Sequence, residues 1–134
     1  MGQHSEDKID QLYNLLRRTQ ESYNNFYDDY MVEKRAFEEV MTETDDLYHS
    51  ARQQIEGIED YTVACVKQSV DDSQIIHEFY DKVFQVQDDL ETDYRKERDS
   101  LNQEYELFEK NFHKKTDKYE EELAKIRRSI HEAE

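Results

Sequence analysis

The residues that most readily support chemistry in a helical protein form few useful pairs in this sequence. His77 and Asp81 lie four residues apart and Asp46 and His49 three apart, so on helices each pair would share a face. Such pairs can bind a metal ion, but a carboxylate-bridged site in a helical bundle needs Glu-x-x-His motifs on facing helices. The chain has no such motif. With 34 acidic residues and five histidines, chance produces these pairs, and we assign no metal ligand.

The one cysteine, Cys65, gives no sign of a nucleophilic site. It lies in the apolar run 61–66, so we interpret it as a small buried hydrophobic residue, with a redox or intermolecular role as the alternative. No Ser-His-Asp or Cys-His arrangement and no glycine-rich phosphate loop is found. The sequence therefore predicts no catalytic residue, no cofactor and no enzymatic activity.

Two short patterns combine an aromatic ring with a carboxylate. Phe84 and Asp88 form F-x-x-x-D, and Tyr105 and Glu109 form Y-x-x-x-E. On a helix this spacing presents the ring and the acid one turn apart, as a small recognition patch would. The alternative is a packed ring beside a solvated acid, which the abundance of both residue types favours.

Composition decides which elements position these residues. The chain has 134 residues, of which 39% are charged and 35% hydrophobic, with no Pro, no Trp and two Gly. Turns are built mainly from Gly, Pro, Asn and Asp, so this chain folds back on itself few times, which excludes all-β and doubly wound folds. Ten Tyr and six Phe also argue against disorder. The sequence predicts an all-α protein of long helices.

The charge balance limits the partners. A net charge of -16 speaks against nucleic acid and against anionic membranes, because both are bound by clustered Lys and Arg. No run of 18 apolar residues is present, and the first residues lack the basic and apolar regions of a signal peptide. We therefore expect a soluble, cytoplasmic protein without membrane insertion, or one co-exported without a cleaved signal peptide.

Hydrophobic periodicity predicts one long helix in each half of the chain. Alternating steps of three and four residues from Ile9 pass through fifteen positions over seven heptads, and eleven of these positions are apolar or aromatic. This pattern is typical of a helix packed on another helix. The stripe of the first half comprises Ile9, Leu12, Leu16, Thr19, Tyr23, Phe26, Tyr30, Glu33, Phe37, Val40, Thr44, Leu47, Ala51, Gln54 and Ile58. The stripe of the second half comprises Ile76, Tyr80, Val83, Leu90, Tyr94, Leu101, Tyr105, Phe108, Phe112, Tyr119, Leu123, Ile126 and Ile130.

A single turn separates the two stripes. The run Ser69-Val70-Asp71-Asp72-Ser73 holds helix N-cap residues and precedes two isoleucines, so it is the best helix start in the chain. We expect one domain over residues 1–134, a long antiparallel helical hairpin with arms at about 5–66 and 74–131 and a turn at about 67–73. Gly57 is the alternative turn site.

The chain has more apolar side chains than two packed stripes can bury. Each helix of a two-helix hairpin covers only a narrow stripe, so the remaining residues face solvent or another protein, in a larger bundle with a partner or as a homodimer. Isolated exposed apolar residues are also normal on any protein surface. Outside the stripes lie Tyr13, Leu15, Tyr27, Met31, Val32, Met41, Tyr48, Ile55, Phe79, Phe84, Val86 and Leu107.

The length, acidity and charged second helix, with the run 90–105 (LETDYRKERDSLNQEY), are similar to one known group. The chain resembles the small helical proteins associated with LXG toxins of type VIIb secretion in Gram-positive bacteria, distant relatives of the WXG-type secretion proteins. In that family, small helical partners pack along the N-terminal helical region of a toxin and deliver it to the export machinery. The sequence differs from the family in two ways. It lacks a Trp-x-Gly turn, and the F-x-x-x-D pattern, which one type of partner in the family carries near its C-terminus, falls at Phe84 and Asp88 in the middle of the chain.

The resemblance implies a targeting factor or chaperone, a non-enzymatic adaptor that binds an LXG toxin N-terminal region and a second small helical protein. The alternative is a self-contained coiled-coil homodimer that acts as a spacer or scaffold. The aromatic surplus makes one set of residues our candidates for partner binding. They are Tyr23, Phe26, Tyr27, Tyr30, Phe37, Phe79, Phe84, Asp88, Tyr105, Phe108 and Phe112.

Overall fold

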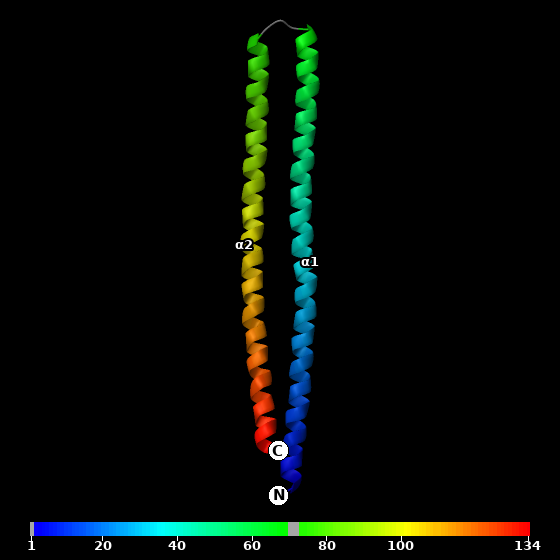
Figure 1. Ribbon diagram of the computed structural model, residues 1–134, viewed down its shortest axis with the longest axis vertical. Helices are drawn as coiled ribbons and strands as arrows, with labels where there is room; N and C mark the ends of the chain where they lie inside the picture. Colours follow the sequence, from blue (N-terminus) through cyan, green and yellow to red (C-terminus); the bar gives the residue numbers. More distant parts are fainter. Residues whose placement is uncertain (1, 70–72) are drawn as a thin grey trace. The chain divides into compact units, whose positions relative to one another are not determined.

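The computed structural model consists of two long α-helices, α1 (Gly2–Ser69) and α2 (Ser73–Ala133), joined in a hairpin (Figure 1). It describes the backbone of residues 2–69 and 73–134 and the side chains of 6–67 and 74–134. The expected all-α hairpin is thereby confirmed. The helix bounds lie within three residues of the expected arms, and part of the expected turn, residues 70–72, lies outside the described residues.

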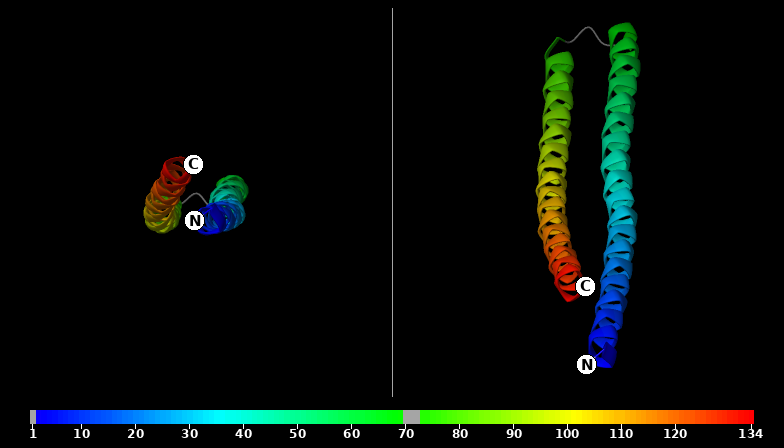
Figure 2. Two further views of the ribbon diagram at one scale, coloured as in Figure 1. Left: turned by 90° about the horizontal axis from the view of Figure 1, so that it is seen from below. Right: turned by 60° about the horizontal axis from the view of Figure 1, so that its bottom comes forward.

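Both helices contribute to each of two compact units. The terminal unit comprises residues 1–36 with 104–134, and the middle unit comprises residues 37–103. In each unit a stretch of α1 lies beside a stretch of α2 that runs in the opposite direction (Figure 2). Gly57, the alternative turn site, is helical within α1, and a Cβ atom there would meet nothing within 4 Å.

The terminal unit has the best-buried interior. Where the helices pack, Tyr30, Leu123, Ile126 and Ile130 are the buried hydrophobic residues and Thr116 is buried among them. No described side chain falls below 2% exposure. This is the physical consequence of pairing only two helices, because every residue of the seam keeps one edge in water.

The stripe predicted for the second half is confirmed over its full length. All thirteen residues are buried or half-buried, from Ile76 in the middle unit to Ile130 in the terminal unit. The pattern left out three polar positions in its seven-residue gaps that also face α1, namely Gln87, Arg98 and Thr116. Each fills the gap of seven residues between two aromatic or aliphatic members of the stripe.

The stripe predicted for the first half is correct to Tyr30. Beyond it Phe37, Thr44 and Ala51 are half-buried as predicted, but the positions between them slip by one residue. After Tyr30 the packed face continues through Lys34, Phe37 and Met41, so the steps from Phe26 to Tyr30 and from Tyr30 to Lys34 are both four residues, where a step of three was expected after Tyr30. An extra step of this kind shifts the packed face of a helix. The residues that actually face α2 beyond this point include Met41, Tyr48 and Ile55, which the sequence placed off the stripe. Val40, Leu47 and Ile58, which it placed on the stripe, are exposed.

Candidate functional site

An aromatic cluster fills the seam of the terminal unit. The Tyr30 ring stacks on Phe112 with 3.6 Å between centroids and on Phe108 with 5.2 Å. The cluster continues along the seam through Phe26, whose ring stacks on Phe112 at 5.6 Å, and ends where Tyr23 meets Tyr119 edge-on. Each stacked pair contributes about 0.5–1.5 kcal/mol beyond the area it buries. These rings therefore hold α1 and α2 together in this unit.

A hydrogen bond between the helices closes the cluster. The Tyr30 hydroxyl donates to Glu109 Oε1 at 2.6 Å. This bond, above all, lowers the pKa of Glu109, with a hydrogen bond from Tyr105 and the charges of Lys34 and His113 adding smaller effects. Burial and the same bond raise the pKa of Tyr30 well above its ordinary value. The Tyr30 hydroxyl and the Glu109 carboxylate are thus stabilised in the protonation states that they hold at neutral pH.

The bond between Tyr30 and Glu109 gives the hairpin a predictable pH dependence. Because the pKa of Glu109 is lowered by folding, its contribution is complete above the ordinary glutamate value of about 4.3 and is lost as the pH falls through the folded value. Because the pKa of Tyr30 is raised, its contribution is complete below about 10 and is lost as the pH rises further. We expect the melting-temperature advantage of the wild type over Tyr30→Phe, measured by circular dichroism, to shrink at both extremes.

The comparison with Tyr30→Phe is necessary because the other carboxylates also titrate in acid. Both proteins share those groups, so only the difference between them reports on the Tyr30 hydroxyl. A difference that stays constant from acid through neutral to strongly alkaline solution would show that this bond does not contribute as described.

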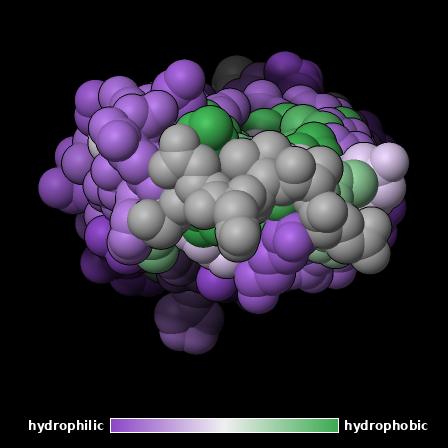
Figure 3. Space-filling model, turned by 90° about the horizontal axis from the view of Figure 1, so that it is seen from above, coloured by the Kyte–Doolittle hydropathy of each residue, from purple (hydrophilic) through white to green (hydrophobic). Residues whose placement is uncertain are grey.

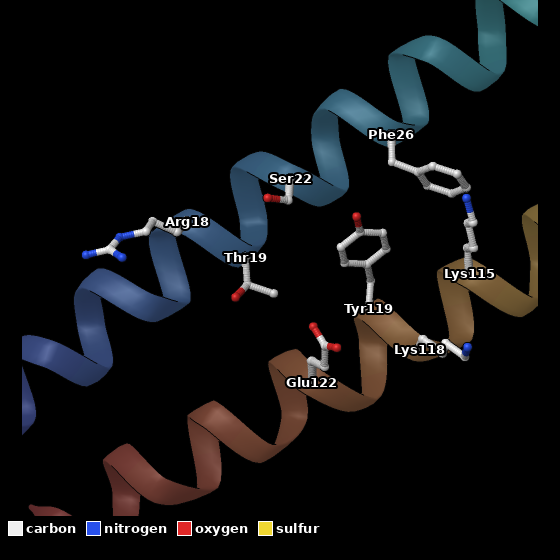
Figure 4. A pocket seen from close by; sticks show the side chains of 8 residues that line it. All are labelled: Arg18, Thr19, Ser22, Phe26, Lys115, Lys118, Tyr119 and Glu122. Atoms are coloured by element: carbon white, nitrogen blue, oxygen red, sulfur yellow. The ribbon is translucent and has the colours of Figure 1, made fainter.

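A groove of about 430 Å³ borders the aromatic cluster and is lined by cations from both helices. The Tyr119 ring stands between the helices, and the Lys115 ammonium lies 5.3 Å from the centre of the Phe26 ring (Figure 4). Arg18 and Lys118 complete the cationic lining, with Glu122 beside them. In a chain of net charge -16, this groove is a local basic patch.

The seam of the middle unit contains a polar group among its rings. Tyr48 stacks on Tyr94 at 4.1 Å, and the Tyr94 hydroxyl donates to Asp45 Oδ1 at 2.5 Å. This bond is the main cause of a raised pKa at Tyr94. Arg98 Nε lies 3.3 Å from the same Asp45 oxygen, so one carboxylate joins a tyrosine and an arginine of α2 to α1.

The exposed apolar residues of α1 in the middle unit share one side of the helix. At 100° per residue, Val40, Leu47, Ile58 and Tyr61 project within about 60° of one another. Their exposure is high for such residues, at 72% for Leu47, 63% for Ile58 and 74% for Tyr61. They lie roughly a quarter turn from the inward stripe, and the slip after Tyr30 places them there.

A matching stripe runs along α2. Ile75 and Val86 are exposed and Phe79 is half-buried, and the three project within about 40° of one another. Phe79 and Val86 each directly precede an inward residue, as Val40 and Leu47 do on α1. Positions with the same offset from the inward residues of two antiparallel helices are related by a two-fold axis perpendicular to the plane of the pair. This rotation keeps each side of the plane, so both stripes lie on the same side of the unit.

We call this combined surface the apolar side face. Its members are Val40, Leu47, Ile58, Tyr61, Ile75, Phe79 and Val86. Seen from above, hydrophobic surface is bordered by hydrophilic surface at this end of the molecule (Figure 3). Of the seven, only Phe79 belonged to the candidates chosen from the sequence.

Most of the predicted partner-binding aromatics pack inside the hairpin. Tyr30 is buried, and six others are half-buried along the seam, namely Tyr23, Phe26, Phe37, Tyr105, Phe108 and Phe112. Phe79 is half-buried beside Tyr80. Tyr27, Phe84 and Asp88 are exposed. A partner that binds the intact hairpin therefore meets the exposed residues, while the seam aromatics hold the two helices together.

The two aromatic–carboxylate patterns have different surroundings. Phe84 is 67% exposed and Asp88 is also exposed, on the side of the middle unit away from the apolar side face. Tyr105 and Glu109 are half-buried, and Glu109 accepts the hydrogen bond of Tyr30. The first pattern is thus available on the surface, whereas the second belongs to the packing of the terminal unit.

The side chains considered for metal binding or nucleophilic chemistry do not converge. Within residues 2–69 and 73–134, no three His, Cys, Asp or Glu side chains gather closely enough to hold a metal ion. His77, Asp81, Asp46 and His49 are all exposed. Cys65 is also exposed, which corrects the expectation that it is buried. It lies on the same side of α1 as Ile58 and Tyr61, where the slipped register places it.

Comparisons with known proteins returned no match, whether with protein families, curated proteins or solved structures. Among the described helices, none is both long and apolar enough to cross a membrane.

Proposed function

We propose that this protein is a non-enzymatic helical adaptor that binds and stabilises another helical protein through the apolar side face. The observation that carries the proposal is the gathering of seven large apolar residues from both helices on one side of the middle unit. Exposed apolar residues are common on proteins, but contiguous patches of them mark interaction sites. A partner helix laid along this side would complete a three-helix arrangement.

The energy available from covering this face is sufficient for binding. Fully burying a Leu, Ile or Val side chain contributes about 1.5–3 kcal/mol relative to leaving it exposed. Leu47 and Ile58 are already partly covered, so each would contribute about two-thirds of that. Seven such residues together supply several kcal/mol against the cost of immobilising a partner, which is the usual basis of helix-in-groove recognition.

The resemblance to LXG-associated proteins supports a more specific proposal. In it, the partner is the N-terminal helical region of an LXG toxin, joined by a second small helical protein. The adaptor would act in the cytoplasm before type VII secretion and could leave the cell with its cargo. The charged run 90–105 and the acidic composition support this assignment.

Co-expression with the N-terminal region of an LXG toxin from the same operon tests the proposal. We expect the two to co-purify, and the melting temperature of the adaptor to rise, because a partner that binds only the folded state stabilises it. The double variant Leu47→Glu, Ile58→Glu should lower the affinity at least tenfold while keeping its helical circular dichroism spectrum. The control Phe84→Glu places one glutamate on an equally exposed residue of the opposite side, and it is matched by each single variant, Leu47→Glu and Ile58→Glu.

Equal loss of affinity in the variant and the control would contradict the assignment to the apolar side face. Absence of any complex would contradict the LXG assignment. A stable homodimer whose melting temperature no helical partner changes would instead support the structural spacer.

A further inference from the structure

Charged residues border the apolar side face. On α1 the residues that flank it on the outer edge are Glu39, Glu43 and Asp46. On α2, Asp93 and Glu97 lie in line with the stripe beyond Val86, and Asp89 lies at its outer edge. All six are exposed. We call them the acidic rim. The α1 edge has no Lys or Arg, and the α2 edge has Lys82 and Lys96.

The acidic rim is not neutralised within the described part of the chain. The ion pairs of the middle unit join Arg52 to Glu56, Arg95 to Glu91 and Arg98 to Asp45. None of them includes a residue of the rim, so its six carboxylates are available to a partner. Their combined field favours positive charge at the two edges of whatever covers the face.

We propose that the apolar side face binds an amphipathic helix whose apolar stripe is flanked by Lys and Arg on both edges. This inference rests on the proposed adaptor function and specifies the chemistry of the partner. From Val40 to Tyr61 the stripe on α1 spans 22 residues, which at a rise of 1.5 Å per residue corresponds to a partner helix of about 32 Å.

A second copy of this chain does not fit the face. Pairing two copies through the same surface would set one acidic rim against another, and like charges at close range are destabilising. With a net charge of -16 on each chain, the long-range repulsion adds to this local effect.

Two synthetic 22-residue helical peptides test the inference against the full chain. Both carry the same leucine stripe, one flanked by lysines and one by glutamates, and binding is measured by fluorescence anisotropy at low and high salt. We expect the lysine peptide to bind at least tenfold more tightly, with an advantage that falls as salt screens the charges. Leu47→Glu, Ile58→Glu should abolish binding of both peptides.

A charge-reversal triple separates the acidic rim from the overall charge. Glu39→Lys, Glu43→Lys, Asp46→Lys should remove the preference for the lysine peptide. The matched control makes the same change of net charge at three exposed acids away from the face and should retain the preference. The control substitutions are Glu38→Lys, Asp60→Lys and Asp81→Lys.

Three outcomes would overturn the inference. They are equal binding of the two peptides, equal loss of preference in the rim variant and its control, and a dimer of the chain alone that Leu47→Glu, Ile58→Glu dissociates. If the rim triple binds the LXG region as the wild type does while Leu47→Glu, Ile58→Glu does not, the adaptor function stands and only the charge preference fails.

Discussion

Replacing Tyr30 by alanine should lower the free energy of unfolding by about 3 kcal/mol, at the lower end of the range for removing a large aromatic side chain. Tyr30 is 8% exposed, stacks on Phe108 and Phe112, and donates to Glu109. Alanine removes all three interactions and leaves a gap that two helices cannot close. For a chain of this size the melting temperature should fall by roughly 10 °C or more.

Thermal denaturation followed by circular dichroism measures the effect of Tyr30→Ala, and Val32→Ala is its matched control. Val32 lies two residues along the same helix but is 68% exposed, so its replacement should change stability by less than about 0.5 kcal/mol. Amide hydrogen exchange adds a second measurement, with Tyr30→Ala reducing protection in residues 6–36 and 104–134 more than in residues 37–67. Equal melting temperatures for the two variants would contradict the role assigned to Tyr30.

The position of Tyr30 also changes how partner-binding variants are interpreted. A charged residue at Phe26 or Tyr30 would disrupt the aromatic seam between α1 and α2. Loss of a complex in such a variant would then report unfolding of the terminal unit. Substitutions at Leu47 and Ile58 avoid this difficulty, because both side chains are exposed in the intact hairpin.

The hairpin could be predicted because its signals are redundant. The scarcity of turn residues, the two long periodic stripes and the helix-start residues before Ile75 all point to one turn between two helices. The stripe of α2 was predictable for the same reason, since its inward positions carry most of the large apolar residues from Ile76 to Ile130.

The packed face of α1 beyond Tyr30 could not be predicted, because two apolar stripes compete there. Val40, Leu47 and Ile58 continue the heptad pattern, while Met41 and Tyr48 lie one position further along. Both sets are apolar enough to be buried, and only the opposing helix decides between them. Tyr48 is inward because Tyr94 of α2 stacks on it. The apolar side face is the stripe that this choice leaves uncovered.

The inward polar residues were missed for a different reason. Hydrophobic patterns do not detect Gln87, Arg98 or Thr116. The seven-residue gaps from Val83 to Leu90, from Tyr94 to Leu101 and from Phe112 to Tyr119 nevertheless leave one inward position each. A helix presents a residue to its neighbour every three or four positions. An apolar gap of seven in a continuous helix therefore indicates a polar residue facing the seam.

Replacing Asp45 by alanine should destabilise the hairpin by about 2 kcal/mol through its effect on Arg98. The Arg98 side chain is 27% exposed and that of Asp45 is 34% exposed, so the pair is only partly screened by water. The Nη1 atom of Arg98 is buried without a hydrogen-bond partner among the described residues. Removing the carboxylate would leave the guanidinium charge unpaired in the seam, and an uncompensated charge there costs more than the pair contributes.

A double-mutant cycle separates the cost of an unpaired charge from the value of the pair. We expect the double variant Asp45→Leu, Arg98→Leu to recover most of the stability lost in Asp45→Leu alone, because two leucines would pack where the ion pair lies. Urea denaturation of the four proteins, wild type, each single leucine variant and the double variant, measures the coupling. Additive losses would mean that Asp45 and Arg98 act independently, and the arginine would then be tolerated in the seam without the carboxylate that binds it.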